Sequence, residues 1–361
     1  MQEVALPLVY ACVTLPSIVS LEKFQQRLHH AEQKWDSIRR IPYSTPGRWV
    51  QALDLSKSAF TGQAQALQFD SILTKLFPLL PFLAHLSLNP SFVLSRRAMA
   101  ALGDRDGAVN LRSLEGISYI PGRMASWDYD PLVRLLKQCV SLEELDVIGQ
   151  GPDPAELEFS FQDSDELPPS GFRPLDLPNL HNITLLSMHS SPVMMALLFS
   201  PLPSLRKITL TPYDDIPYPS SLVSQFISTH GEKLRSLLLF SPKAWPTRLH
   251  PSPSTLLETC PNLRHLSIEN PLPPLKFSGR HSLQILSIPR PNADFWRVFE
   301  KILPQLPQLC VLRTRDVHWI RKGMNTIAQG AGVQGEMREW RKRLGRHGIR
   351  LFDAGWSDIK E

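Results

Sequence analysis

Three glycines near the C-terminus are the first residues whose spacing suggests chemistry. Gly330, Gly332 and Gly335 match G-x-G-x-x-G, the pattern of a phosphate-binding turn, and Asp353 follows the last glycine by eighteen residues. The preceding stretch, IRKGMNTIAQ (320–329), is polar and has a helical pattern instead of that of a buried strand. Only 26 residues follow Gly335, too few to complete a nucleotide-binding unit. We therefore predict a loop here and no cofactor.

The cysteines and histidines are too dispersed to predict a metal centre or a nucleophile with its base. Cys12, Cys139, Cys260 and Cys310 form no C-x-x-C pair, and the eleven histidines are scattered along the chain. No G-x-S-x-G, P-loop or H-E-x-x-H motif occurs. We expect no catalytic, cofactor-binding or metal-binding residues, and so no enzyme. Cys139, Cys260 and Cys310 are predicted to be buried structural residues.

Basic residues concentrate towards the C-terminus, where residues 313–350 hold ten of the chain's Lys and Arg residues. In this stretch Met337, Trp340 and Leu344 share one face of a predicted helix, and basic residues occupy the other faces. We predict a capping helix with a solvated basic side. The alternative is a nucleic-acid-associated protein that uses this basic block to contact phosphates.

Leucines recur with L-x-x-L-x-L spacing along most of the chain, at intervals of 20 to 38 residues. Weaker copies of the pattern begin at Val50 and Leu111. The apolar positions of the clearest copies are Leu83/Leu86/Leu88, Leu142/Leu145/Val147, Leu180/Ile183/Leu185, Leu205/Ile208/Leu210, Leu234/Leu237/Leu239, Leu263/Leu266/Ile268, Leu283/Leu286/Ile288 and Leu309/Leu312/Thr314. This spacing is typical of leucine-rich repeats.

Each copy predicts a short strand preceded by a helix. The L-x-L pair places alternate side chains on one face of a strand. Segments such as DPLVRLLKQC (130–139) and FWRVFEKIL (295–303) have the helical period. A single strand and helix cannot bury their own apolar faces, so neighbouring repeats must stack. The sequence therefore predicts an α/β fold, a leucine-rich-repeat solenoid (horseshoe) with parallel strands on the concave face and helices on the convex face.

We expect three regions in the chain. Residues 1–45 are predicted to be an N-terminal cap, and residues 46–316 about ten irregular leucine-rich repeats with an acidic insertion at 151–172. Residues 317–361 are predicted to be a basic C-terminal helical cap with a final strand. No apolar run reaches the ~18 residues of a membrane span. The N-terminal stretch lacks the basic region of a secretion signal, so we expect a cytoplasmic or nuclear protein without a membrane partner.

Four segments resemble fungal F-box/leucine-rich-repeat proteins with cysteine-containing repeats. They are CPNLRHLSI (260–268), ALPLVYACVTLPSIVSLEKFQQRL (5–28), GRWVQALDLS (47–56) and LGRHGIRLFDAGW (344–356). The second and third are similar to the region that follows an F-box in such proteins, although no F-box that would bind a Skp-family adaptor is recognisable. The resemblance implies a substrate receptor of a ubiquitin ligase, with ubiquitin-ligase components as possible partners.

A binding surface is predicted on the concave face, where the side chains between the repeat leucines point outward. The mixture of acidic, hydroxyl, apolar and basic residues there suits a protein segment better than a phosphate backbone. Tyr213 and Tyr218 flank two aspartates in a loop and are predicted to be exposed anchors. The predicted partner-binding residues are Glu144, Asp146, Lys207, Thr209, Tyr213, Tyr218, Ser236, Leu238, His265, Ile285 and Arg313. The identity of the bound protein is not predicted.

Overall fold

The computed structural model describes residues 2–34, 45–120, 129–151, 172–212, 221–240, 255–268, 275, 277–291, 293–318 and 333–358. The chain divides into two compact units, Met1–Leu205 and Arg206–Glu361. The predicted acidic insertion at 151–172 lies outside the described residues, apart from its first residue and its last.

The first unit alternates strands with helices. Its strands are β1 (Cys12–Thr14), β2 (Ala52–Asp54), β3 (His85–Ser87), β4 (Ser113–Ser118), β5 (Glu144–Ile148) and β6 (Asn182–Leu186). Its helices are α1 (Gln2–Ala11), α2 (Ile18–Gln33), α3 (Gly62–Leu76), α4 (Arg96–Gly103), α5 (Pro131–Gln138) and α7 (Pro192–Leu198). Each strand pairs in parallel with the next strand along the chain.

The second unit repeats this arrangement. Its strands are β7 (Lys207–Leu210), β8 (Ser236–Leu239), β9 (His265–Ser267), β10 (Ile285–Ile288), β11 (Val311–Thr314) and β12 (Arg350–Phe352). Its helices are α8 (Val223–His230), α9 (Leu256–Thr259), α10 (Ala293–Ile302) and α12 (Val333–Gly345). These strands also pair in parallel and in chain order. Both units are therefore α/β, with parallel strands that do not close into a barrel.

The repeated leucines form the core, which confirms the predicted register. All three positions of every clear copy are buried, including Thr314 at the third position of the last copy. The middle leucines face one another across neighbouring strands, as Leu145 does with Ile183 and Leu266 with Leu286. The second and third positions of each copy are buried together because residues two apart on a strand lie on the same face.

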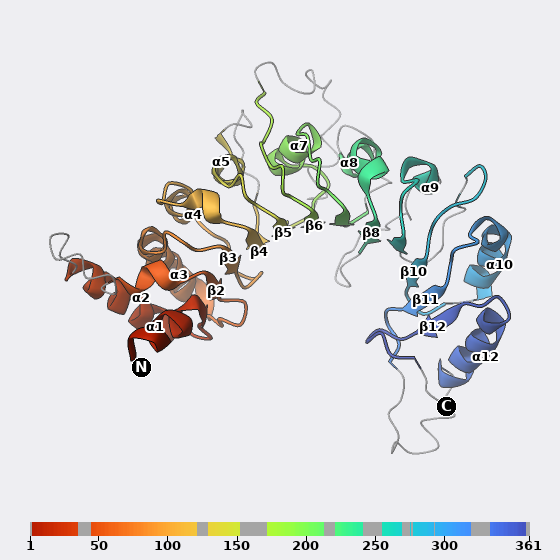
Figure 1. Ribbon diagram of the computed structural model, residues 1–361, viewed down its shortest axis with the longest axis horizontal. Helices are drawn as coiled ribbons and strands as arrows, with labels where there is room; N and C mark the ends of the chain where they lie inside the picture. Colours follow the sequence, from red (N-terminus) through yellow and green to blue (C-terminus); the bar gives the residue numbers. More distant parts are fainter. Residues whose placement is uncertain are drawn as a thin grey trace. The chain divides into compact units, whose positions relative to one another are not determined.

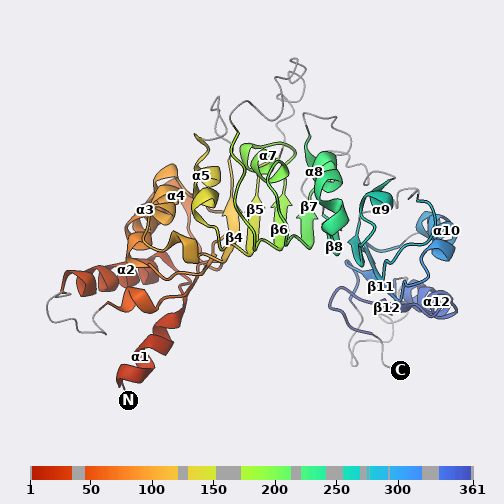
Figure 2. The same cartoon turned by 45° about the horizontal axis from the view of Figure 1, so that its top comes forward.

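The helices cover one face of the strands in each unit. Figures 1 and 2 show α3, α4, α5 and α7 on the same side of β4, β5 and β6. Helix α5 illustrates why these segments fold as helices. The Asp130 carboxylate accepts hydrogen bonds from the amides of Leu132 (2.9 Å) and Val133 (3.0 Å) at the N-terminus of the helix, and Pro131 occupies its first position. We call the strand surface away from the helices the open face.

Two expectations about the thiols are confirmed and one is wrong. Cys139 and Cys260 are buried, and burial raises the pKa of both thiols to about 12. Cys310 is exposed and lies just before β11, where the alternation of the strand does not yet apply. The loop predicted around Gly335 is also wrong in part, since this glycine lies within α12.

The basic C-terminal stretch contributes apolar side chains to the second unit. Met337 and Leu344 of α12 are buried, and the Trp340 ring lies 4.9 Å from the Trp296 ring of α10 in an edge-on arrangement. Arg343 pairs with Glu339 one turn earlier, at 3.3 Å. No helix among the described residues combines the length and the apolar character that crossing a membrane requires.

Candidate functional site

Acidic side chains gather on the open face of the first unit. Glu115 of β4 and Glu144 and Asp146 of β5 occupy strand positions that alternate with buried leucines. Side chains at such positions must point away from the core. The repeat pattern thus places three carboxylates on two neighbouring strands, about 4.8 Å apart.

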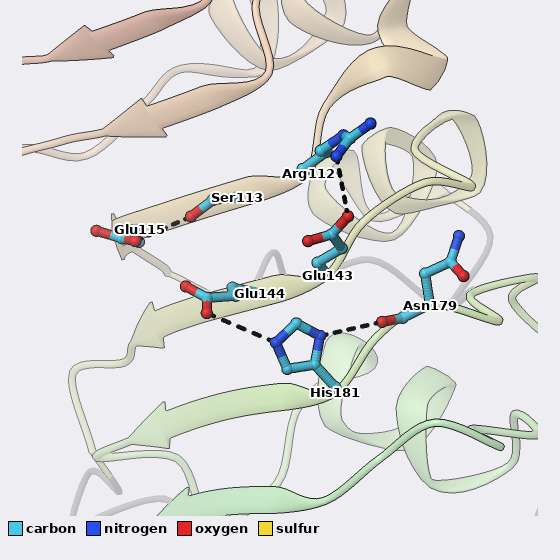
Figure 3. Close-up of polar contacts among 7 residues, drawn as sticks. All are labelled: Arg112, Ser113, Glu115, Glu143, Glu144, Asn179 and His181. Carbon is cyan, nitrogen blue, oxygen red and sulfur yellow. Dashed lines mark hydrogen bonds and ion pairs between the residues drawn. The ribbon is translucent and has the colours of Figure 1, made fainter.

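Two of these carboxylates have polar neighbours. Glu115 accepts hydrogen bonds from Ser113 (2.9 Å) and from Ser87 of β3 (3.1 Å). The Nε2 atom of His181 lies 3.7 Å from Glu144, and its Nδ1 atom lies 3.3 Å from the carbonyl oxygen of Asn179. Figure 3 shows Glu115 and Glu144 on adjacent strands, with His181 reaching Glu144 from the segment just before β6. These contacts orient the carboxylates but leave acceptor capacity on the surface.

Asp146 is held in a less favourable environment than its neighbours. Burial raises the pKa of its carboxyl group, a hydrogen bond from the Gly116 amide opposes the rise, and the charge of Glu115 adds to it. Its Oδ1 atom is buried and has no hydrogen-bond partner, and the same holds for Oδ1 of Asn182. Asp146 is therefore a carboxylate that could accept a further donor.

A glycine bulge creates the contact with Asp146. The register between β4 and β5 shifts between Leu114 and Ile117, and Gly116 has a left-handed φ of 69°. A Cβ atom at Gly116 would lie 2.2 Å from the carbonyl oxygen of Leu88, so this position excludes larger residues.

The open face of the second unit holds two rows of side chains that follow from the strand register. Lys207, Ser236, His265 and Ile285 occupy equivalent positions on successive strands. The second row, two residues further along each strand, comprises Thr209, Leu238, Ser267, Ser287 and Arg313. This surface therefore mixes hydroxyl, aliphatic and basic groups.

His265 is the polar centre of this face. Its Nε2 atom lies 2.9 Å from the Ser287 hydroxyl, and its Nδ1 atom lies 3.3 Å from the Ser236 hydroxyl. Burial, together with the nearby charges of Arg313, Lys207 and Arg315, lowers the pKa of His265 to about 4. The imidazole is consequently neutral near pH 7, within a group of three cations.

The segment after β12 returns to Arg313. The Arg313 guanidinium carbon lies 4.6 Å from the Trp356 ring centroid, and its Nη2 atom donates to the Ala354 carbonyl at 2.6 Å. The Nε atom of Arg313 is buried and has no hydrogen-bond partner. Part of the second open face is thus covered by the chain's own C-terminal segment.

The predicted partner-binding residues divide between the two open faces. Glu144 and Asp146 lie on the first, and seven lie on the second: Lys207, Thr209, Ser236, Leu238, His265, Ile285 and Arg313. Tyr213 and Tyr218 lie outside the described residues.

Sequence reasoning missed Glu115, Arg315 and Trp356 as members of these faces. Glu115 belongs to a weak repeat interrupted by the bulge, and Trp356 follows the last repeat. Arg315 had a signal, because it falls two residues after the predicted face residue Arg313, just beyond the end of β11.

The division into units also separates charge. Residues 206–361 contain 23 Lys and Arg against 13 Asp and Glu, whereas residues 1–205 contain 16 Lys and Arg against 21 Asp and Glu. The acidic open face therefore belongs to an acidic unit, and the cationic one to a basic unit. Such an imbalance affects partner choice and association rates more than it affects the fold.

A surface groove away from the open faces does not assemble a reaction centre from the described residues. One groove of about 450 Å³ lies between α4 and α5 and is lined by groups that include Asp104, Tyr129 and Arg134. None of these three is a nucleophile held against a base. Among the described residues, no group of three His, Cys, Asp or Glu side chains could hold a metal ion.

The sequence matches no protein-family model, and no curated protein is similar to it.

Proposed function

We propose that this chain is a non-enzymatic interaction protein of the leucine-rich-repeat class, with its open faces as the binding surface. The L-x-x-L-x-L register, parallel strands in chain order and helices on one side support this class. The resemblance to F-box/leucine-rich-repeat proteins supports a substrate-recognition or scaffold role, with a ubiquitin-ligase assembly as the setting.

The environment of Asp146 carries the proposal. A carboxylate that is partly buried, close to another carboxylate and incompletely hydrogen-bonded lowers the stability of the folded chain. Groups held at such a cost are concentrated at binding sites, where a partner supplies the missing contact. A basic or amide-bearing segment laid across β4 to β6 would supply donors to both Asp146 and Asn182.

A second candidate, nucleic-acid binding, is favoured by one observation. Arg206, Arg235 and Arg264 precede β7, β8 and β9, and successive backbones are joined by hydrogen bonds of 2.8 and 2.9 Å. These three exposed arginines therefore form a row with a spacing of about 4.8 Å. The adjoining open face argues against this candidate. Leu238 and Ile285 lie among its cations, at positions where binding to a phosphate backbone would favour Lys and Arg.

Affinity capture with a charge-changed open face tests the proposal. The variant Glu144→Arg/Asp146→Asn should lose the proteins captured by the wild-type chain. The control Glu22→Arg/Glu32→Arg changes charge on α2, on the helical side, and should retain them. Identical protein partners with both variants would contradict the proposal. Capture that disappears after nuclease treatment, or that falls steeply with salt, would instead favour nucleic acid.

A further inference from the structure

The cationic open face of the second unit has features that point to a particular kind of partner. We propose that Arg313, Lys207 and Ser267, with Trp356 beside them, bind carboxylate side chains of an acidic, extended peptide segment. This inference rests on the proposed function, since it assumes that the open face binds a protein. It specifies the chemistry of the segment that lies on the second unit.

Two buried polar atoms on this face lack a partner. Ser267 is 1% exposed and its hydroxyl has no hydrogen-bond partner, and the Nε atom of Arg313 is also buried and unpartnered. Both residues lie in one register row, separated by Ser287 on β10, so their backbones are about 10 Å apart. The hydroxyl of Ser287 is already in contact with His265 at 2.9 Å. An oxyanion between Ser267 and Arg313 would accept hydrogen bonds from both unpartnered groups.

The charges on the face also favour an anion. Lys207, Arg313 and Arg315 all act electrostatically on the same imidazole, that of His265, so positive charge is concentrated on this face. Asp353 is the acidic group that acts on Arg313, and it already accepts a hydrogen bond from the Ser357 amide at 2.7 Å. Like charges held together raise the free energy of the unoccupied face, and a bound carboxylate would offset that repulsion.

Trp356 prepares Arg313 for binding. Its φ of 58° is a conformation that bulky residues rarely adopt, and such backbone strain is concentrated at functional sites. Trp356 is 45% exposed, and its ring centroid lies 4.6 Å from the guanidinium carbon of Arg313, so the ring restricts the orientation of the guanidinium plane. A fixed guanidinium plane favours bidentate binding of a carboxylate.

Apolar side chains distinguish a peptide from a nucleic acid on this face. Leu238 and Ile285 are half-buried between the polar positions, and the exposed part of Trp356 adds aromatic surface. A peptide that alternates acidic and apolar residues would match this pattern, because its side chains also alternate along an extended backbone.

Fluorescence anisotropy with the full chain tests this inference. The probe is a fluorescein-labelled peptide of alternating Glu and Ala, and the matched probe alternates Lys and Ala. The acidic peptide should bind. Arg313→Gln and Lys207→Gln should each weaken its binding by about tenfold, the scale expected for one charge-assisted hydrogen-bonded contact. Arg338→Gln on α12 removes the same charge away from the face and should leave binding unchanged.

Arg313→Lys provides a variant that keeps the charge and loses the fork, and it should weaken binding less than Arg313→Gln. No binding of the acidic peptide, or equal binding by all variants, would overturn the inference. Displacement by an equal concentration of inorganic phosphate would also overturn it, as would tighter, Arg313-dependent binding of an oligothymidylate. If only this inference is wrong, the acidic peptide does not bind, but affinity capture still depends on Glu144 and Asp146. If the proposed function is wrong, affinity capture does not depend on Glu144 and Asp146.

Discussion

Leu266 of β9 pairs in register with Leu286 of β10, and both side chains are completely buried. Equivalent pairs recur along each unit, as with Ile208 and Leu237 on β7 and β8. Each repeat therefore contributes to a core that its neighbours complete. Loss of one such side chain should be felt by the repeats on both sides.

Leu266→Ala should lower the free energy of unfolding by ~2–5 kcal/mol, because the truncation removes buried apolar surface and leaves a cavity. Urea denaturation monitored by circular dichroism measures the change. Leu238→Ala is the control, since this leucine lies half-buried on the open face. Equal losses for the two variants would contradict the register.

Arg105→Ala should cost ~2–4 kcal/mol, because three buried carbonyl groups would each lose a hydrogen-bond donor. The Arg105 side chain is buried and donates to the carbonyls of Leu102 (3.2 Å), Leu83 (2.8 Å) and Leu80. Burial lowers the pKa of the guanidinium to about 10, which leaves it charged at neutral pH. Thermal unfolding measures the loss.

Arg105→Lys separates charge from geometry. An ammonium group cannot reproduce the three directed donors, so this variant should also be destabilised, by at least ~1 kcal/mol. Arg112→Ala, which removes an exposed partner of Glu143, should cost less than ~1 kcal/mol. Full rescue by lysine would refute the role assigned to the guanidinium fork.

Asp146→Asn and Asp54→Asn should change stability in opposite directions at pH 7. Burial raises the pKa of Asp146, so the neutral amide should be tolerated or should stabilise the fold by up to ~1 kcal/mol. Hydrogen bonds from the Ser56 hydroxyl and amide lower the pKa of Asp54, so its replacement should destabilise the fold. Chemical denaturation of both variants makes the comparison. A larger loss for Asp146→Asn would show that this carboxylate is structural.

Acidification should destabilise the chain through His265. Its pKa of about 4 lies below the ~6.5 of an unfolded histidine, so the unfolded state takes up the proton first as pH falls from about 6.5 towards 4. Between pH 7 and 5, the wild type should lose ~1–2 kcal/mol more than His265→Gln. Urea titrations at both pH values measure this difference. Equal losses in the two proteins would contradict the environment described for the imidazole.

Local alternation made the core and much of the open face predictable. Once Leu145 and Val147 are assigned to the core, Glu144 and Asp146 must point the other way. The same argument placed Lys207 and His265 on the open face, because the L-x-x-L-x-L spacing had already defined the register of their strands.

Long-range contacts explain what was not predicted. The bulge at Gly116 depends on the close approach of the Leu88 carbonyl, which no local pattern reveals. The placement of Trp356 over Arg313 depends on the course of the chain after β12, which the spacing of the repeats does not define. The exposure of Cys310 shows that membership of a repeat does not by itself mean burial.

Carboxylate footprinting tests the central claim, that the open face is the binding surface, most directly. The protein alone and its complex with a captured partner would be labelled with glycine ethyl ester and carbodiimide, then analysed by mass spectrometry. Glu144 on the open face should lose labelling in the complex, while Glu32 on α2 should keep it. Protection of Glu32 with unchanged labelling of Glu144 would place the partner on the helical side and contradict the account.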